Sequence, residues 1–146
     1  MAVLNAGHDV PLVITQPDRP KGRGLRMIAT PVKTAALDAG LRVVEAGKIS
    51  PDLIEELSVL QPDIIAVSAF GLFLPRKFRK AAKTACINVH PSLLPKYRGA
   101  APVQWSIING DTLTGVSIMH VASKLDAGGI ILQETVTIEP MDTAET

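Results

Sequence analysis

Asn88 and His90 stand two residues apart at the end of the apolar run Ala85–Val89, which is typical of a buried strand. Alternate residues of a strand point to the same face, so we expect these two polar side chains to share one side of a sheet. An imidazole can act as an acid or a base near neutrality. A side-chain amide can stabilise a developing oxyanion, and removing such a donor typically slows a reaction by ~10²–10³-fold. The pair therefore predicts an acid–base site, although a loop asparagine and a capping histidine would produce the same pattern.

Asp126 is the acidic residue that could complete this site. It lies in the turn-rich stretch Lys124–Gly129, which follows a predicted strand over Thr114–His120. A carboxylate that hydrogen-bonds His90 would fix its tautomer and favour its charged form. An Asn, a His and an Asp at the ends of neighbouring strands suit acyl transfer, whereas an aspartate before glycines is also typical of an ordinary turn.

Other kinds of reactive centre have weaker support. Ser92 lacks the nucleophile-elbow signature. Cys86 lies inside an apolar strand, where a cysteine is usually an inert small hydrophobe. His8 and His120 have no metal-ligand spacing with each other or with Cys86, so we expect no metal.

Two clusters of cations suggest contacts with phosphates. The first lies in a Gly- and Pro-rich loop predicted over Gln16–Thr30, with no acid after Asp18, and consists of Arg19, Lys21, Arg23 and Arg26. A flexible basic loop suits an RNA clamp that becomes ordered on binding, and a solvated surface loop is the alternative. It lacks the Gly-Lys-Ser/Thr ending of a nucleotide phosphate loop. The second cluster either extends this footprint or forms an exposed helix face, and it consists of Arg76, Lys77, Arg79, Lys80 and Lys83.

Strands and helices must alternate to position these residues. Strands are predicted over Val10–Thr15, Leu41–Val44, Asp63–Ser68, Ala85–Val89, Thr114–His120 and Ile130–Ile138. Helices are predicted after the cap-and-proline pairs Thr30-Pro31 and Ser50-Pro51, with shorter ones near Pro75–Lys83 and over Val103–Ile108. This order predicts an α/β doubly wound domain, and apolar runs without alternation favour parallel strands. Ligands bind such sheets beyond the carboxyl ends of strands, where the loops after Val67, Val89 and His120 lie.

Composition limits the class of protein. With 146 residues, 47% of them hydrophobic and 20% charged, the chain suits one globular domain. A net charge of +1 argues against a wholesale basic nucleic-acid binder, and 3% aromatic residues argue against a base-stacking platform. One cysteine excludes a disulfide scaffold and suits a reducing compartment, so we expect a cytoplasmic location. No apolar run reaches the ~18 residues of a membrane span.

Two sets of motifs resemble a known family. Asn88–Gly99, read Asn-Val-His-Pro-Ser-Leu-Leu-Pro-Lys-Tyr-Arg-Gly, is followed by Leu125–Gly128, and together they are similar to the folate-dependent formyltransferase superfamily. The second set resembles the methionyl-tRNA formyltransferase branch and consists of Gln16–Gly24, Pro31–Lys33, Gly99–Gln104 and Gly115–Met119. The match covers nearly the whole chain.

The resemblance implies a Rossmann-like, doubly wound and mostly parallel sheet, the formyltransferase fold. It implies transfer of a formyl group from 10-formyltetrahydrofolate to the methionine amine of initiator methionyl-tRNA, with Asn88, His90 and Asp126 as the catalytic triad. The implied folate-binding residues are Phe70, Gly71, Leu72, Ser92, Leu93, Leu94 and Pro95. The loop that carries Arg19, Lys21, Arg23 and Arg26 would contact the acceptor stem of the tRNA. We expect a monomer with no membrane partner.

The family pattern includes an additional strand before Met1–Gly7 and continues beyond Thr146 into a tRNA-binding β-barrel domain. We therefore expect residues 1–146 to form a partial catalytic domain that lacks its first strand and that barrel. Rival functions are a glycinamide ribonucleotide or sugar-nucleotide formyltransferase and a hydrolase that releases formate. A non-catalytic folate- or RNA-binding remnant is the rival from another class of protein.

Overall fold

The structure is a computed structural model that describes residues 1–146, apart from the side chain of Lys21. The chain forms two compact units. The first comprises Met1–Pro51 and Phe70–Phe73, and the second comprises Asp52–Ala69 and Leu74–Thr146.

The first unit is built around two short parallel strands, β1 (Val13–Thr15) and β4 (Val43–Glu45). Helix α2 (Pro31–Asp38) packs on both strands and begins as the sequence predicts. Thr30 is its N-cap, and the Thr30 hydroxyl accepts a hydrogen bond from the Lys33 amide at 3.1 Å. A single helical turn, α1 (Ala2–Asn5), precedes β1.

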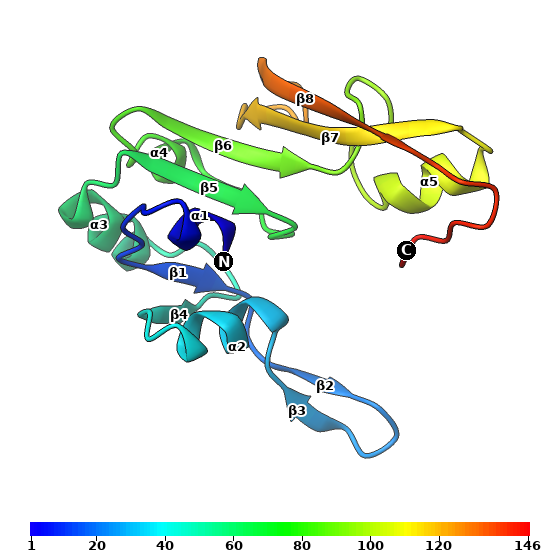
Figure 1. Ribbon diagram of the computed structural model, residues 1–146. Helices are drawn as coiled ribbons and strands as arrows, with labels where there is room; N and C mark the ends of the chain where they lie inside the picture. The colour runs from blue at the N-terminus through cyan, green and yellow to red at the C-terminus, as the bar shows by residue number, and fades with distance from the viewer. The chain divides into compact units, whose positions relative to one another are not determined.

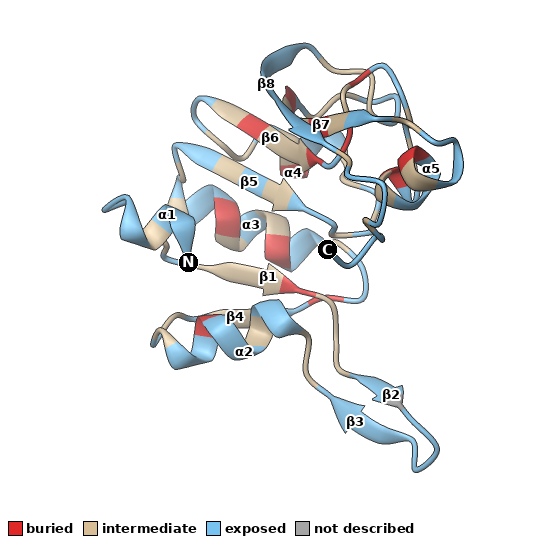
Figure 2. Ribbon diagram, turned by 45° about the vertical axis from the view of Figure 1, so that its right-hand side comes forward, coloured by how far each residue is buried: buried red, intermediate tan, exposed pale blue. Residues whose placement is uncertain are grey.

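A β-hairpin replaces the loop that was predicted over Gln16–Thr30, which is a correction to the sequence reading. Strand β2 (Arg19–Lys21) pairs antiparallel with β3 (Arg26–Ile28), and Figure 1 shows the hairpin extending from the rest of its unit. Gly22 and Leu25 adopt positive φ values of 74° and 45° in the connecting turn. The described side chains of this hairpin are exposed, as Figure 2 shows, so no apolar alternation was required to form it.

The second unit contains a four-stranded sheet in the order β5-β6-β7-β8. Its strands are β5 (Ile64–Ser68), β6 (Ala85–His90), β7 (Leu113–His120) and β8 (Ile130–Thr137). Its helices are α3 (Pro51–Leu60), α4 (Arg76–Arg79) and α5 (Pro102–Ile108). Strands β5 and β6 are parallel, whereas β7 and β8 continue the sheet in antiparallel pairs. The predicted α/β class is confirmed; within this sheet β5–β6 is the parallel pair, and β6–β7 and β7–β8 are the antiparallel pairs.

In helix α3 of the second unit, burial follows the spacing of the apolar residues. Leu53 and Leu57, one helical turn apart, are the buried face of α3. Met119 of β7 and Phe78 of α4 are each only 2% exposed. Among the strand pairs of the described residues, β5 pairs only with β6 and β1 only with β4, so each has one unpaired edge.

Candidate functional site

His90 ends strand β6 and is 5% exposed. Its Nε2 lies 2.9 Å from the backbone oxygen of Tyr97. A carbonyl oxygen only accepts hydrogen bonds, so this contact requires a hydrogen on Nε2. The other ring nitrogen, Nδ1, is left to face a different partner.

That partner is Asp126, whose Oδ2 lies 3.6 Å from His90 Nδ1. This separation is an ion-pair contact when the ring is protonated, but it exceeds the length of a hydrogen bond. The expectation that Asp126 hydrogen-bonds His90 and fixes its tautomer is therefore corrected: the Tyr97 carbonyl engages the ring instead. Asp126 Oδ2 accepts its hydrogen bond from the Gly99 amide at 2.8 Å.

The turn that carries Asp126 depends on a close backbone approach. Asp126 itself adopts a φ of 43°. A Cβ added to Gly128 would lie 1.7 Å from the backbone oxygen of His120, at the end of β7. Gly128 therefore allows the turn to close against β7, which brings the carboxylate to the histidine.

Asn88 lies on the same face of β6 as His90, because the two residues alternate with Val89 along the strand. It is half-buried, and the register places it opposite Met119 of β7, while His90 lies opposite Ser117. Among the described residues, the Asn88 side chain has no hydrogen-bond or ion-pair partner. Its amide is thus available to a substrate oxygen.

The segment Ser92–Pro95 is held by a polar network built on the buried Ser117. Ser117 Oγ donates to the Ser92 carbonyl at 2.6 Å and accepts from the Leu94 amide at 3.1 Å. Gln133 Nε2 of β8 donates to Ser117 Oγ at 2.8 Å and to the Leu94 carbonyl at 3.0 Å. Ser92 and Ser117 are both fully buried, so this segment is rigidly positioned beside His90.

Gly115 lets the same segment approach the sheet. A Cβ at this position would lie 2.6 Å from Leu93 Cδ2 and 2.1 Å from the backbone oxygen of Glu134. The glycine thus leaves room both for the Leu93 side chain and for the pairing of β7 with β8.

The other predicted folate-binding segment, Phe70–Leu72, belongs to the first unit. Gln16 Nε2 donates to the Phe70 carbonyl at 2.6 Å. Gly71 has a φ of 72°, and a Cβ there would lie 2.8 Å from Gln16 Nε2. Within its own unit this segment is therefore tied to the residue that leads into the hairpin.

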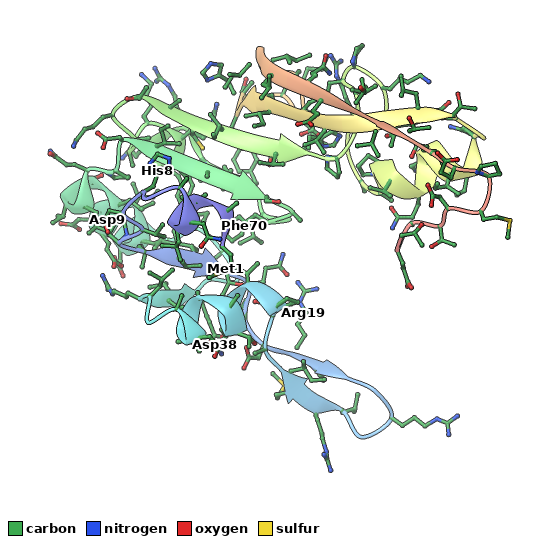
Figure 3. The ribbon with its side chains drawn as sticks, viewed as in Figure 1. Met1, His8, Asp9, Arg19, Asp38 and Phe70 are labelled. Carbon is green, nitrogen blue, oxygen red and sulfur yellow. The ribbon has the colours of Figure 1, made fainter. Side chains whose placement is uncertain are left out.

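The predicted RNA-contacting cations lie along the hairpin. Arg19, which Figure 3 labels at its base, donates to Gln16 Oε1. Arg23 and Arg26 are exposed, and the side chain of Lys21 lies outside the described part of the chain. Leu25 and Met27 are also exposed, by 71% and 62%, so the hairpin presents apolar as well as charged groups.

Lys33 of α2 anchors the base of the hairpin. Its Nζ lies 2.8 Å from Asp18 Oδ1 and 2.5 Å from Glu45 Oε1. Hydrogen bonds with Asp18 and then Glu45 raise the pKa of Lys33 above its ordinary value. The hydroxyls of Thr15 and Thr30 meet at 2.7 Å and join the two ends of the segment.

The second basic cluster is partly structural. Arg79 donates to the backbone oxygens of Leu74 and Val121, at 3.1 and 3.4 Å. Lys83 lies 3.5 Å from Asp63, and both side chains are well exposed. Arg76, Lys77 and Lys80 are exposed.

A surface hollow of about 640 Å³ adjoins this cluster, and its lining includes Arg76, Thr84 and Cys86. It lies toward the amino end of β6, whereas His90 ends that strand. Burial raises the pKa of the Cys86 thiol to about 11, although the charge of Arg79 opposes this shift. A protonated, buried thiol agrees with the prediction that Cys86 is not a nucleophile.

The structure also bears on metal binding and on membrane contact. Across the part of the chain that the structure describes, no three His, Cys, Asp or Glu side chains are grouped to hold a metal ion. No helix among the described residues is long and apolar enough to cross a membrane.

The sheet topology and the polar residues at the carboxyl end of β6 define an α/β protein with a candidate acid–base centre. The chain belongs to the formyl transferase family, whose model matches residues 2–146. It is 48% identical to a methionyl-tRNA formyltransferase of Acidobacterium capsulatum over 99% of this chain and 47% of the relative. It is 50% identical to one of Agathobacter rectalis, over 97% of this chain and 46% of the relative. The chain thus spans about half the length of these curated relatives.

Solved structures show the same fold. The structure is similar to phosphoribosylglycinamide formyltransferase from Bacillus halodurans, with a TM-score of 0.78, 26% identity, and coverage of 99% of this chain and 75% of that one. A phosphoribosylglycinamide formyltransferase from Anaplasma phagocytophilum matches with a TM-score of 0.72 and 28% identity, over 99% of this chain and 67% of that one. These likenesses confirm the predicted formyltransferase fold.

Sequence reasoning missed the residues that support the site. Tyr97 and Gly99 lie inside the motif that carried the resemblance, but their roles are those of a backbone carbonyl and a backbone amide. Ser117 and Gln133 lie in the predicted strands Thr114–His120 and Ile130–Ile138, but neither was identified as a site residue.

Proposed function

We propose that this protein transfers the formyl group of 10-formyltetrahydrofolate to the methionine amine of initiator methionyl-tRNA. The family of the chain supports formyl transfer, and the names of its relatives point to this acceptor. The observation that favours a tRNA over a small acceptor is the basic β2–β3 hairpin, whose base is fixed by Lys33 and whose described side chains are exposed.

The reaction would use the groups around His90. The methionine amine attacks the formyl carbon, so that a C–N bond forms and an oxyanion develops on the formyl oxygen. Asn88 and protonated His90 stabilise that charge, and Asp126 stabilises the imidazolium. The bond from the formyl carbon to the folate nitrogen then breaks, while a proton passes from the attacking amine to that nitrogen.

In the second unit the proposed folate contact is Ser92–Pro95, and in the first unit the family resemblance assigns this role to Phe70–Leu72. The network of Ser117 and Gln133 supports the first segment, and the Gln16 hydrogen bond supports the second. The hairpin would contact the tRNA through Arg19, Lys21, Arg23 and Arg26. An enzyme of translation initiation with these substrates would work in the cytoplasm.

A second candidate acceptor is glycinamide ribonucleotide, because the similar solved structures are enzymes that act on it. A small acceptor gives no reason for an exposed basic hairpin. The charge of the β2–β3 hairpin should therefore affect transfer to the RNA acceptor only.

The test is to incubate the protein with labelled 10-formyltetrahydrofolate and either initiator methionyl-tRNA or glycinamide ribonucleotide. We expect label on the methionyl-tRNA, no transfer in His90→Ala, and a raised KM for tRNA in Arg23→Gln. Label only on glycinamide ribonucleotide would overturn the proposal, as would free formate without an acceptor. Folate binding without transfer to either acceptor would identify a binding remnant.

A further inference from the structure

Tyr97 makes contacts in two directions. Its backbone oxygen accepts the hydrogen bond from His90 Nε2 at 2.9 Å. Its hydroxyl donates to Asp111 Oδ2 at 2.8 Å and accepts from Asn109 Nδ2 at 3.0 Å. The side chain is therefore anchored to the turn between α5 and β7, while the carbonyl reaches the histidine.

This anchoring holds an uncommon backbone conformation. Tyr97 has a φ of 54°, in the left-handed region that a bulky residue rarely adopts. Such a conformation persists when the surrounding contacts determine it. The hydrogen bonds of the Tyr97 hydroxyl supply those contacts, so the direction of the carbonyl depends on the far end of the side chain.

The direction of the Tyr97 carbonyl decides which ring nitrogen of neutral His90 carries the hydrogen and which one can accept a proton. A hydrogen on Nε2 leaves the lone pair of the neutral ring on Nδ1. Nδ1 faces Asp126 Oδ2 at 3.6 Å, so a proton gained by the ring arrives on the side of the carboxylate. In the other tautomer, with the hydrogen on Nδ1, the lone pair of Nε2 would face a lone pair of the Tyr97 carbonyl oxygen.

The same loop also holds the carboxylate. Gly99, two residues after Tyr97, donates its amide hydrogen to Asp126 Oδ2 at 2.8 Å. One short segment thus fixes both the ring and its acidic neighbour. Displacing Tyr97 would disturb the two partners together.

We propose that Tyr97, anchored through its hydroxyl to Asp111, is a positioning residue that keeps His90 in the Nε2–H form and makes Nδ1 the nitrogen that gains and loses the proton. This inference rests on the proposed function for its catalytic meaning. Its structural part, the tautomer of His90, can be measured without any substrate.

The tautomer is read from long-range ¹H–¹⁵N spectra of protein labelled with ¹⁵N-histidine. The chain has three histidines, and His90→Gln assigns the signal. At a pH where the ring is neutral, we expect the wild-type signal of the Nε2–H form. We expect Tyr97→Phe and Asp111→Ala to give a mixture of tautomers, because each removes the hydroxyl–carboxylate bond.

Two matched variants separate positioning from general damage. Asp111→Asn keeps an oxygen that accepts from the Tyr97 hydroxyl, and we expect it to retain the Nε2–H form. Lys96→Gln removes the cation that lies 3.1 Å from Asp111 Oδ2 but leaves the tyrosine bond, so it should also retain that form.

Kinetics provide the second readout. Loss of the correct tautomer lowered kcat by ~10⁴-fold in the Ser-His-Asp triad. Because Tyr97→Phe keeps the carbonyl in the chain, we expect a smaller loss of roughly tenfold in kcat, with the KM for folate unchanged and recovery in Asp111→Asn relative to Asp111→Ala.

An Nδ1–H signal for wild-type His90 would overturn the proposal, and so would unchanged tautomer and kcat in both Tyr97→Phe and Asp111→Ala. If no acceptor is formylated but the tautomer shifts as expected, the proposed function fails and the positioning role stands. If transfer occurs and the tautomer is unaffected in both variants, the proposed function stands and the positioning role of Tyr97 fails. Should Tyr97→Phe fail to fold, Asp111→Ala carries the test.

Discussion

Replacing Ser117 by alanine should destabilise the second unit more than replacing a buried serine whose hydroxyl makes a single hydrogen bond. The hydroxyl is fully buried, and its removal leaves the Ser92 carbonyl and the Leu94 amide without their partner. Gln133 keeps its second bond, to the Leu94 carbonyl. An unsatisfied buried group costs about 1–3 kcal/mol, so two groups give roughly 2–6 kcal/mol. This is a large part of a total stability of ~5–15 kcal/mol.

Urea unfolding followed by tryptophan fluorescence measures this effect. Trp105 is the one tryptophan of the sequence and lies in α5 of the second unit. With a slope of about 2 kcal/mol per molar urea, the expected loss lowers the midpoint by roughly 1–3 M.

Ser106→Ala is the matched control. Ser106 is also fully buried, but its hydroxyl makes one hydrogen bond, to the Val103 carbonyl of its own helix at 2.8 Å. Its loss should cost about 1 kcal/mol. If Ser117→Ala and Ser106→Ala lower the midpoint equally, the network does not hold the Ser92–Pro95 segment and the reasoning is refuted.

Three further predictions concern separate parts of the chain. Burial raises the pKa of Cys86 from 9.0 to about 11, so iodoacetamide at pH 8 should react ~100-fold more slowly with the folded protein than in denaturant, and equal rates would contradict this. Because the folded thiol keeps its proton longer, its contribution to stability is complete below pH 9 and is lost between pH 9 and 11. Gly115→Ala should lower the free energy of urea unfolding by about 1–3 kcal/mol, because its Cβ would lie 2.1 Å from the backbone oxygen of Glu134. Gly24→Ala is the control, since the nearest atom to its Cβ would lie 4.0 Å away. Lys33→Met should speed cleavage of the hairpin by an arginine-specific protease, because two carboxylate contacts at its base are lost; an unchanged rate would show that Lys33 is not the anchor.

The sequence was sufficient for elements that bury a regular apolar pattern or begin with a cap. Helix α2 starts at Pro31 after the Thr30 cap, and β6 and β7 begin within a residue of the predicted positions. The hairpin β2–β3 was not predicted, because exposed strands need no alternation of apolar and polar residues. Short side-chain contacts at its base stabilise it instead, and such contacts join residues far apart in the sequence.

The sequence pointed to the three residues of the candidate triad because Asn, His and Asp are reactive side-chain types at or after predicted strands. The groups that hold the triad in place were not predicted, because many of them are main-chain groups. The Tyr97 carbonyl binds the ring, the Gly99 amide binds Asp126, and the Ser92 carbonyl and Leu94 amide bind Ser117. A main-chain group is present at every position, so residue type alone does not mark it.

This reliance on main-chain groups explains why a continuous motif carries the site. Residues 90–99 contribute one side chain of the candidate triad, yet two main-chain groups of this segment contact the His90 ring and Asp126. The side chains that matter along it are those that fix the backbone, such as Tyr97 through Asp111 and Ser92 through its bond to the Lys96 carbonyl at 2.7 Å. Substituting these backbone-fixing residues should therefore impair the acid–base centre although Asn88, His90 and Asp126 are unchanged. The tautomer of His90 is the observable that reports this directly.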